Sequence, residues 1–128
     1  MNIKDYEKYA KPILRIGLAI VFLYFGISQL LDPEAWLVWL PSFAQNLPIE
    51  ATTLILLNGI SEVILGTLLL LGLLTRIVSF LLFIHILGIT ISVGLTPVGV
   101  RDFGLTIATL VIFLNGKDDY CLDNKFRK

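Results

Sequence analysis

Apolar residues form four long runs that are separated by short stretches containing polar residues, glycine or proline. A helix needs about 20 mostly apolar residues to cross a hydrocarbon core of about 30 Å. The pattern therefore predicts four membrane-spanning helices, over residues 13–31, 51–71, 76–96 and 101–115. The last is short for a crossing, so we expect either that its ends lie at the membrane interface or that neighbouring residues extend it.

Breaks in the pattern mark the ends of these spans. Pro12 suits the first turn of the first helix, and Gly72 begins a tight turn of about four residues, which makes the second and third helices antiparallel neighbours. Pro97, together with Gly94 and Gly99, ends the third span. A secretory signal peptide is the alternative for the basic start and first apolar run, but the run is long for one and no Ala-x-Ala site follows.

The connector between the first two spans, residues 32–50, has its own composition. Its three prolines prevent one continuous helix. Its aromatic residues are of the kind that anchor at headgroup level: Trp36, Trp39 and Phe43. We expect residues 33–40 to form a short helix that lies on the bilayer surface.

Composition agrees with a membrane protein. Hydrophobic residues make up 56% of the 128 residues and mean hydropathy is +0.85, whereas soluble proteins contain about 45–50% apolar residues. The predicted fold class is thus an all-α integral membrane four-helix bundle, a single domain over residues 1–128 with the lipid bilayer as its first partner. The formal net charge is zero, so no nucleic acid partner is expected.

The distribution of basic residues predicts the orientation. With four spans both termini lie on one side, and nine basic residues fall on that side while only Arg101 falls on the other. The nine are Lys4, Lys8, Lys11, Arg15, Arg76, Lys117, Lys125, Arg127 and Lys128. Cytoplasmic loops carry such an excess, so we expect a multi-pass plasma-membrane protein with cytoplasmic termini. Cys121 is then a reduced thiol.

Glu62 is the most informative residue, because it lies roughly 16 Å along the second span, near the bilayer midplane. An ionised carboxylate at that depth costs at least a few kcal/mol unless it is protonated, paired or hydrated. Asn58, Gly59 and Gly66 share its helix face. We therefore expect this face to point toward protein, with Glu62 as a proton acceptor or, alternatively, as a structural hydrogen-bonding group.

His85 in the third span lies at the same distance from the intervening turn as Glu62, roughly 13 Å. The two side chains should thus lie at the same depth, where histidine can relay protons, although a structural role is the simpler alternative. The third span has no further histidine or carboxylate at ligand spacing, and the chain has one cysteine, so no metal site is expected.

Four other polar residues complete the predicted ligand-binding set with Glu62 and His85. Gln29 and Asn58 should line the outer half of the same interior, or merely form interhelical hydrogen bonds. Arg101 either reaches inward toward Glu62 or extends to the headgroups. Asp102 suits the free amides of a helix start, and as neighbours along a helix the two need not pair.

Several segments resemble the DoxX family in matching order. They are RIGLAIVFLYFGISQLLDP at 15–33, EVILGTLLLLGLLTR at 62–76, RDFGL at 101–105 and CLD at 121–123. The resemblance implies a small four-helix membrane protein, related to the membrane subunit of a thiosulfate:quinone oxidoreductase and to a member of a membrane oxidoreductase complex tied to thiol stress. Many members carry Lys where this chain has Gln29.

Three functions follow as hypotheses. The first is a subunit of a quinone-linked redox complex, with a partner redox subunit, a quinone as possible ligand and Glu62 and His85 handling protons. The second is a non-catalytic scaffold or assembly factor with a structural polar core, and the third is a small transporter. The sequence has no nucleotide-binding loop, nucleophile triad or flavin fingerprint, so no intrinsic cofactor is expected, and whether the protein is an enzyme or a homo-oligomer is left open.

Overall fold

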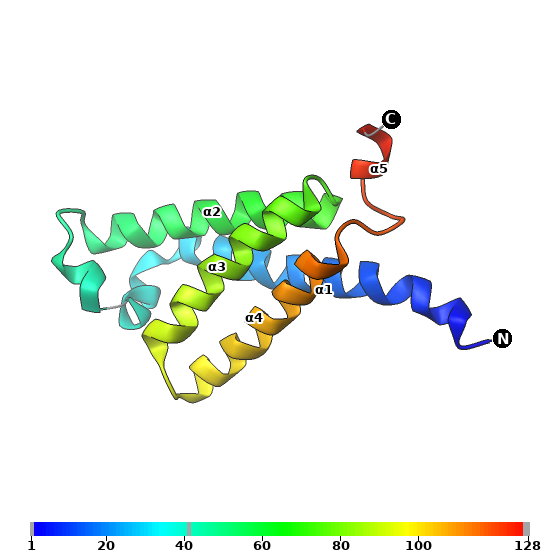
Figure 1. The fold of residues 1–128 in the computed structure, drawn as a ribbon. Coiled ribbons are helices and arrows are strands. Elements are labelled where there is room, and N and C mark those ends of the chain that lie inside the picture. The colour runs from blue at the N-terminus through cyan, green and yellow to red at the C-terminus, as the bar shows by residue number, and fades with distance from the viewer. Residues whose placement is uncertain (1, 41, 127–128) are drawn as a thin grey trace.

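Four long helices form a bundle in the computed structural model, which describes residues 2–40 and 42–126 (Figure 1). They are α1 (Lys4–Leu31), α2 (Ala51–Leu71), α3 (Thr75–Val93) and α4 (Pro97–Asn115), followed by the short α5 (Asp123–Phe126). Each of the four long helices is long and apolar enough to cross a membrane. The predicted all-α, four-span fold is confirmed.

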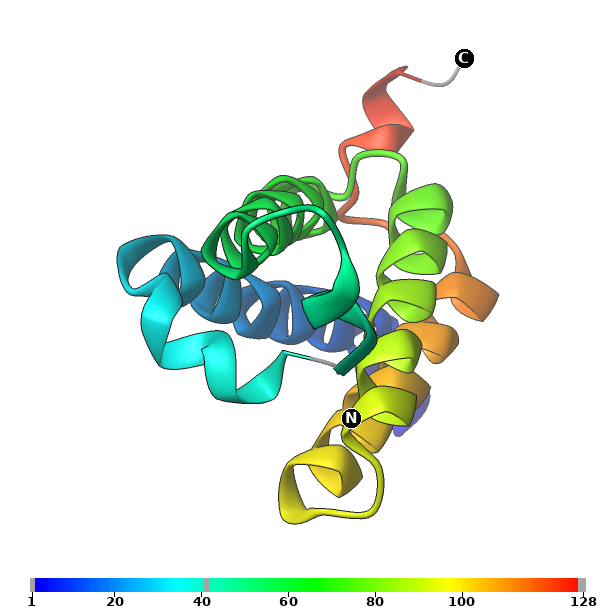
Figure 2. The same cartoon turned by 90° about the vertical axis from the view of Figure 1, so that its left-hand side faces the viewer.

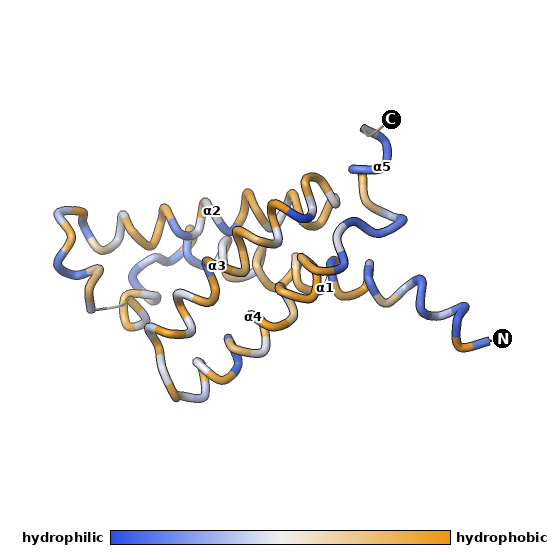
Figure 3. The backbone as a smooth tube through the Cα atoms, in the orientation of Figure 1, coloured by the Kyte–Doolittle hydropathy of each residue, from blue (hydrophilic) through white to orange (hydrophobic). Residues whose placement is uncertain are grey.

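The helices pack chiefly as two pairs, α1 against α2 and α3 against α4. The N-terminus, the C-terminal segment and the α2–α3 turn lie toward one end of the bundle, and the connector lies at the other (Figures 1 and 2). Hydrophilic residues concentrate at the start of α1, in the connector and in the C-terminal segment (Figure 3).

Two glycines let α1 and α2 approach closely. A Cβ atom on Gly26 would lie 2.9 Å from the carbonyl oxygen of Gly59, and a Cβ on Gly59 would lie 2.9 Å from that of Gly26. Small residues at helix crossings in membranes allow this kind of backbone contact. Gln29 of α1 and Glu62 of α2 each lie one turn from the crossing, and their side chains meet across it, with Gln29 Nε2 3.0 Å from Glu62 Oε2.

Helix α1 begins nine residues before the predicted span, so Pro12 lies inside it and not in its first turn. Asp5 and Glu7 lie in the actual first turn, where acidic side chains interact favourably with the helix dipole. At 1.5 Å per residue, 28 residues extend about 42 Å. The first turns of α1 therefore extend beyond a hydrocarbon core of about 30 Å.

The α3–α4 boundary also differs from the prediction. Helix α3 ends at Val93, where Gly94 adopts a positive φ of 76°, and Pro97 begins α4 instead of ending α3. The Thr96 hydroxyl accepts a hydrogen bond from Gly99 N at 3.0 Å, which is an N-cap. Helix α4 is thus 19 residues long. The predicted start at residue 101 was wrong, and neighbouring residues extend the span, which was the other alternative.

The connector forms two 3-10 segments, η1 (Pro33–Trp39) and η2 (Ser42–Asn46), in place of one short helix. It lies across the end of the bundle between the two helix pairs (Figure 2). The Trp36 indole N–H donates to the Ser28 hydroxyl of α1 at 3.3 Å. The depth of the connector in the bilayer stays a prediction.

The C-terminal segment fastens the α2–α3 turn. Leu122 N donates to Leu71 O at 3.1 Å, and Asp123 N donates to Gly72 O at 3.0 Å. The Asp123 carboxylate accepts from Leu74 N at 2.6 Å and from Thr75 N at 3.0 Å. Asp123 therefore caps the start of α3, although it lies 48 positions after Thr75 in the sequence.

Candidate functional site

Glu62 is buried in the bundle, 4% exposed, and its carboxyl group is hydrogen-bonded to side chains from three helices. Gln29 Nε2 of α1 donates to Oε2 at 3.0 Å, and Asn58 Nδ2 of α2 donates to Oε1 at 3.3 Å. His85 Nε2 of α3 lies 3.0 Å from the same Oε1. Glu62 and His85 are therefore level, as predicted, and the face of α2 that bears Glu62 points toward protein.

The carboxylate also determines how its amide neighbours are oriented. Because an ionised carboxylate only accepts hydrogen bonds, the amide nitrogens of Gln29 and Asn58 must face it. Asn58 Nδ2 additionally donates to Gln29 Oε1 at 2.6 Å. Both amide protons of Asn58 are thus donated to Gln29 and Glu62, and the Asn58 Oδ1 takes no part in these hydrogen bonds.

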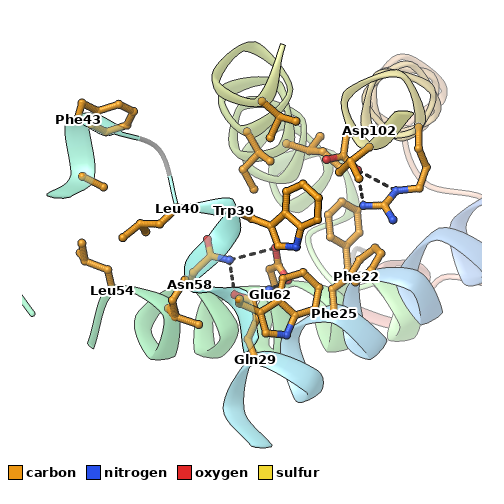
Figure 4. A pocket seen from close by; sticks show the side chains of 18 of the residues that line it. Phe22, Phe25, Gln29, Trp39, Leu40, Phe43, Leu54, Asn58, Glu62 and Asp102 are labelled. Atoms are coloured by element: carbon orange, nitrogen blue, oxygen red, sulfur yellow. Dashed lines mark hydrogen bonds and ion pairs between the residues drawn. The ribbon is translucent and has the colours of Figure 1, made fainter. Parts of the chain in front are cut away.

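A cavity of about 350 Å³ adjoins this group and has a mainly apolar, aromatic wall (Figure 4). The four long helices and the connector all contribute to it. Its polar lining residues are Gln29, Asn58, Glu62, Arg101 and Asp102. Its aromatic lining residues are Phe22, Phe25, Trp36, Trp39 and Phe43. This volume is in the range of small-molecule sites, which combine apolar walls with few polar groups.

His85 is not among the residues that line the cavity. Its side chain is 24% exposed, so it connects Glu62 to the surface of the bundle. Gly88, which shares the His85 face of α3, has nothing within 4 Å of a Cβ position among the described residues. The order from the cavity outward is thus Glu62 and then His85.

Arg101 and Asp102 form the second polar feature of the wall. Arg101 Nε and Nη2 donate to the same oxygen, Asp102 Oδ1, at 3.2 and 3.1 Å, and the guanidinium carbon lies 5.1 Å from the centre of the Phe25 ring. Arg101 therefore does not reach Glu62, the alternative that the sequence left open. Because α4 begins at Pro97, Asp102 lies past its first turn, and the prediction that it satisfies the free amides of a helix start was wrong.

The structure brings the predicted residues into one region: Gln29, Asn58, Glu62 and His85 form one hydrogen-bonded group, and Arg101 and Asp102 lie on the wall of the adjoining cavity. Sequence reasoning missed the contribution of the connector, because proline-rich aromatic segments give no signal of which face they cover. Leu40 and Phe43 line the cavity beside Trp39. Among the described residues, no group of three or more His, Cys, Asp or Glu could hold a metal ion.

A second buried polar cluster lies toward the other end of the bundle. The Arg15 side chain is 2% exposed, and its Nε donates to Asp118 Oδ2 at 2.7 Å. Arg15 Nη1 donates to the carbonyls of Leu69 and Leu70 at 2.8 and 2.7 Å. This cluster joins α1, the end of α2 and the C-terminal segment, so its role is structural.

Asp123, in the same C-terminal segment, is an ionisable group whose pKa is shifted by the fold. Partial burial raises the pKa of Asp123. Hydrogen bonds from Thr75 N, Leu74 N and the Thr75 hydroxyl, together with the charge of Lys117, lower it by a larger amount, so the pKa lies below the ordinary 3.8. The ionised form is therefore the one that the fold stabilises.

Comparison with known proteins agrees with this structure. The DoxX family model matches residues 10–95, which is more than half of the chain. The matched part contains most of α1, all of α2 and α3 and the connector, and hence Gln29, Asn58, Glu62 and His85. No curated protein and no solved structure matches the chain. The protein, with four helices fit to span a membrane, therefore belongs to the DoxX family of membrane proteins.

Proposed function

We propose that this protein is a subunit of a membrane redox complex and that its cavity binds a quinone or a similar small ligand, with Glu62 and His85 handling protons. The observation that carries the proposal is a buried carboxylate on the wall of an aromatic cavity of about 350 Å³. Ionisable groups inside membrane spans are costly, and they usually mark proton relays or substrate pathways.

The contact between Glu62 and His85 supports a proton-transfer role. The 3.0 Å separation between Glu62 Oε1 and His85 Nε2 fits two arrangements of one proton. Either His85 donates Nε2–H to the carboxylate, or protonated Glu62 donates to Nε2 of a neutral ring. A proton can thus pass between the cavity wall and the half-buried imidazole without any movement of the backbone.

The test is quinone-dependent electron transfer by the complex purified through this subunit. Glu62→Gln keeps the size of the side chain and removes the proton-accepting charge. We expect turnover to fall by about 100-fold, the lower range for loss of a general acid or base. Glu50→Gln, an exposed glutamate before α2, is the matched control and should retain full turnover. Unchanged turnover in Glu62→Gln contradicts the proposal.

A scaffold or assembly factor is the second candidate, and one observation favours it. Among the described residues, every buried side-chain nitrogen or oxygen atom has a hydrogen-bond partner without any ligand. If the polar group is only structural, Glu62→Gln lowers thermal stability, whereas partner capture is unchanged and no ligand binding is lost. Measuring ligand binding and stability on the same preparations separates the two functions.

We also propose a plasma-membrane location with cytoplasmic termini, on the charge distribution of the chain. Reporter fusions test the orientation. A reporter active only in the cytoplasm should be active at Lys128 and inactive in the connector. The opposite pattern contradicts the orientation.

A further inference from the structure

The hydrogen-bonding capacity of the cavity wall identifies which redox form of the ligand fits. We infer that the cavity binds a hydroquinone, an aromatic ring with two hydroxyl donors, more tightly than the corresponding quinone. This inference rests on the proposed function, since it presupposes that the cavity binds a ligand of this class.

Asn58 supplies the first free acceptor. Its Nδ2 donates to Gln29 Oε1 at 2.6 Å and to Glu62 Oε1 at 3.3 Å, whereas no described residue donates to its Oδ1. Reversing the amide would place Oδ1 against the carboxylate, which cannot donate when ionised. Asn58 therefore presents an oxygen that a ligand hydroxyl can bind.

Asp102 supplies the second free acceptor. The residue is 5% exposed, and both Arg101 contacts go to Oδ1, so Oδ2 has no donor among the described residues. Since no fully buried polar atom in the described chain lacks a partner, Oδ2 borders accessible space. The space that Asp102 lines is the cavity.

These two acceptors lie on different helices, Asn58 on α2 and Asp102 on α4, with the aromatic side chains of the wall around the same space (Figure 4). A hydroquinone carries an O–H at each end of a flat apolar ring. A hydroxyl can donate to either oxygen, and the ring can pack on the aromatic side chains. A quinone has carbonyl oxygens at those positions, which cannot donate, so both wall acceptors would be left without a partner.

The test compares binding of a decyl-benzoquinone and of its hydroquinone to the full chain in detergent micelles, by titration calorimetry under anaerobic conditions. Loss of a buried hydrogen-bond partner commonly changes affinity about tenfold or more. We therefore expect the hydroquinone to bind at least about tenfold more tightly. That ratio would raise the two-electron potential of the bound couple by about 30 mV, which a redox titration measures independently.

Asp102→Asn provides the sharper version of the test. Asparagine keeps one oxygen for Arg101 and can place an NH₂ donor where the free oxygen was, so the preference should shrink or reverse toward the quinone. Asp119→Asn, which changes an exposed aspartate outside the cavity, should keep the wild-type preference.

Each outcome decides a different point. Equal binding of the two forms by the wild-type chain, or tighter binding of the quinone, overturns this inference and leaves the quinone cavity standing. An unchanged preference in a folded Asp102→Asn variant overturns the role of Asp102. If neither form binds above the level of empty micelles, the proposed function fails together with the inference. The wild-type comparison decides the matter even if the variant does not fold.

Discussion

Removing the Asp118 carboxylate should strongly destabilise the bundle, because the carboxylate is the counter-ion of a buried guanidinium. Arg15 and Asp118 form a pair with side chains 2% and 4% exposed, and Asp118→Ala leaves the guanidinium without its counter-ion. Breaking one side of a buried pair typically costs about 3–5 kcal/mol. Because Arg15 keeps its hydrogen bonds to the carbonyls of Leu69 and Leu70, we expect the lower end, about 3 kcal/mol.

Two further variants separate charge from packing at this pair. Asp118→Asn keeps one acceptor for Arg15 and should cost less, about 1.5 kcal/mol, the value of a hydrogen bond to a charged group. The double variant Arg15→Met with Asp118→Ala removes both charges. It should cost less than the sum of the single changes, since no uncompensated charge stays buried.

The assay is the free energy of unfolding in mixed micelles, measured by titration with a denaturing detergent and followed by helical circular dichroism. Asp119→Ala is the matched control, because Asp119 is the adjacent, exposed aspartate. Its effect should stay within about 0.5 kcal/mol. If Asp118→Ala lies equally close to the wild type, the pair contributes no net stability and the reasoning is refuted.

Two other changes test the α2–α3 turn. Gly72 has φ +73° and its Cβ position lies 2.6 Å from Cys121 Cα, so Gly72→Ala should cost about 2 kcal/mol. Gly17 lies in α1 with nothing packed within 4 Å of its Cβ position among the described residues, so Gly17→Ala should instead stabilise by about 0.5–1 kcal/mol. Unfolding titrations in which Gly17→Ala is the more destabilising of the two changes would contradict this reasoning. Because the pKa of Asp123 is lowered in the fold, its stabilisation is present above the ordinary pKa of 3.8 and is lost as pH falls through the folded pKa. Thermal scans should therefore show wild type and Asp123→Asn converging below that pH, and a constant difference would exclude this cap.

The sequence predicted the centre of the site because simple helix geometry governs it. Glu62 and His85 lie at equal distances from one tight turn, so a helical hairpin must bring them to one level, and the structure places them 3.0 Å apart. Gln29 was predictable for the same reason, because it follows Phe22 and Gly26 on one face of α1, and all three are buried.

What could not be predicted depends on segments without a helical period. Arg15 and Asp118 are 103 positions apart, and Asp118 lies in an irregular stretch, so no spacing relates them. The same holds for the connector, where Trp39 and Phe43 form cavity wall through a path that depends on tertiary contacts. The capping role expected of Asp102 failed because Thr96, five residues before the expected start of α4, supplies the cap.

The most direct test of the central claim is native mass spectrometry of the protein released from its own membrane, with the bound small molecules identified by fragmentation. We expect one quinone or hydroquinone for each chain, retained by Glu50→Gln and lost or greatly reduced in Glu62→Gln. If only phospholipid accompanies the wild-type chain, or if a quinone is retained equally in the Glu62 variant, the cavity is not the site proposed here.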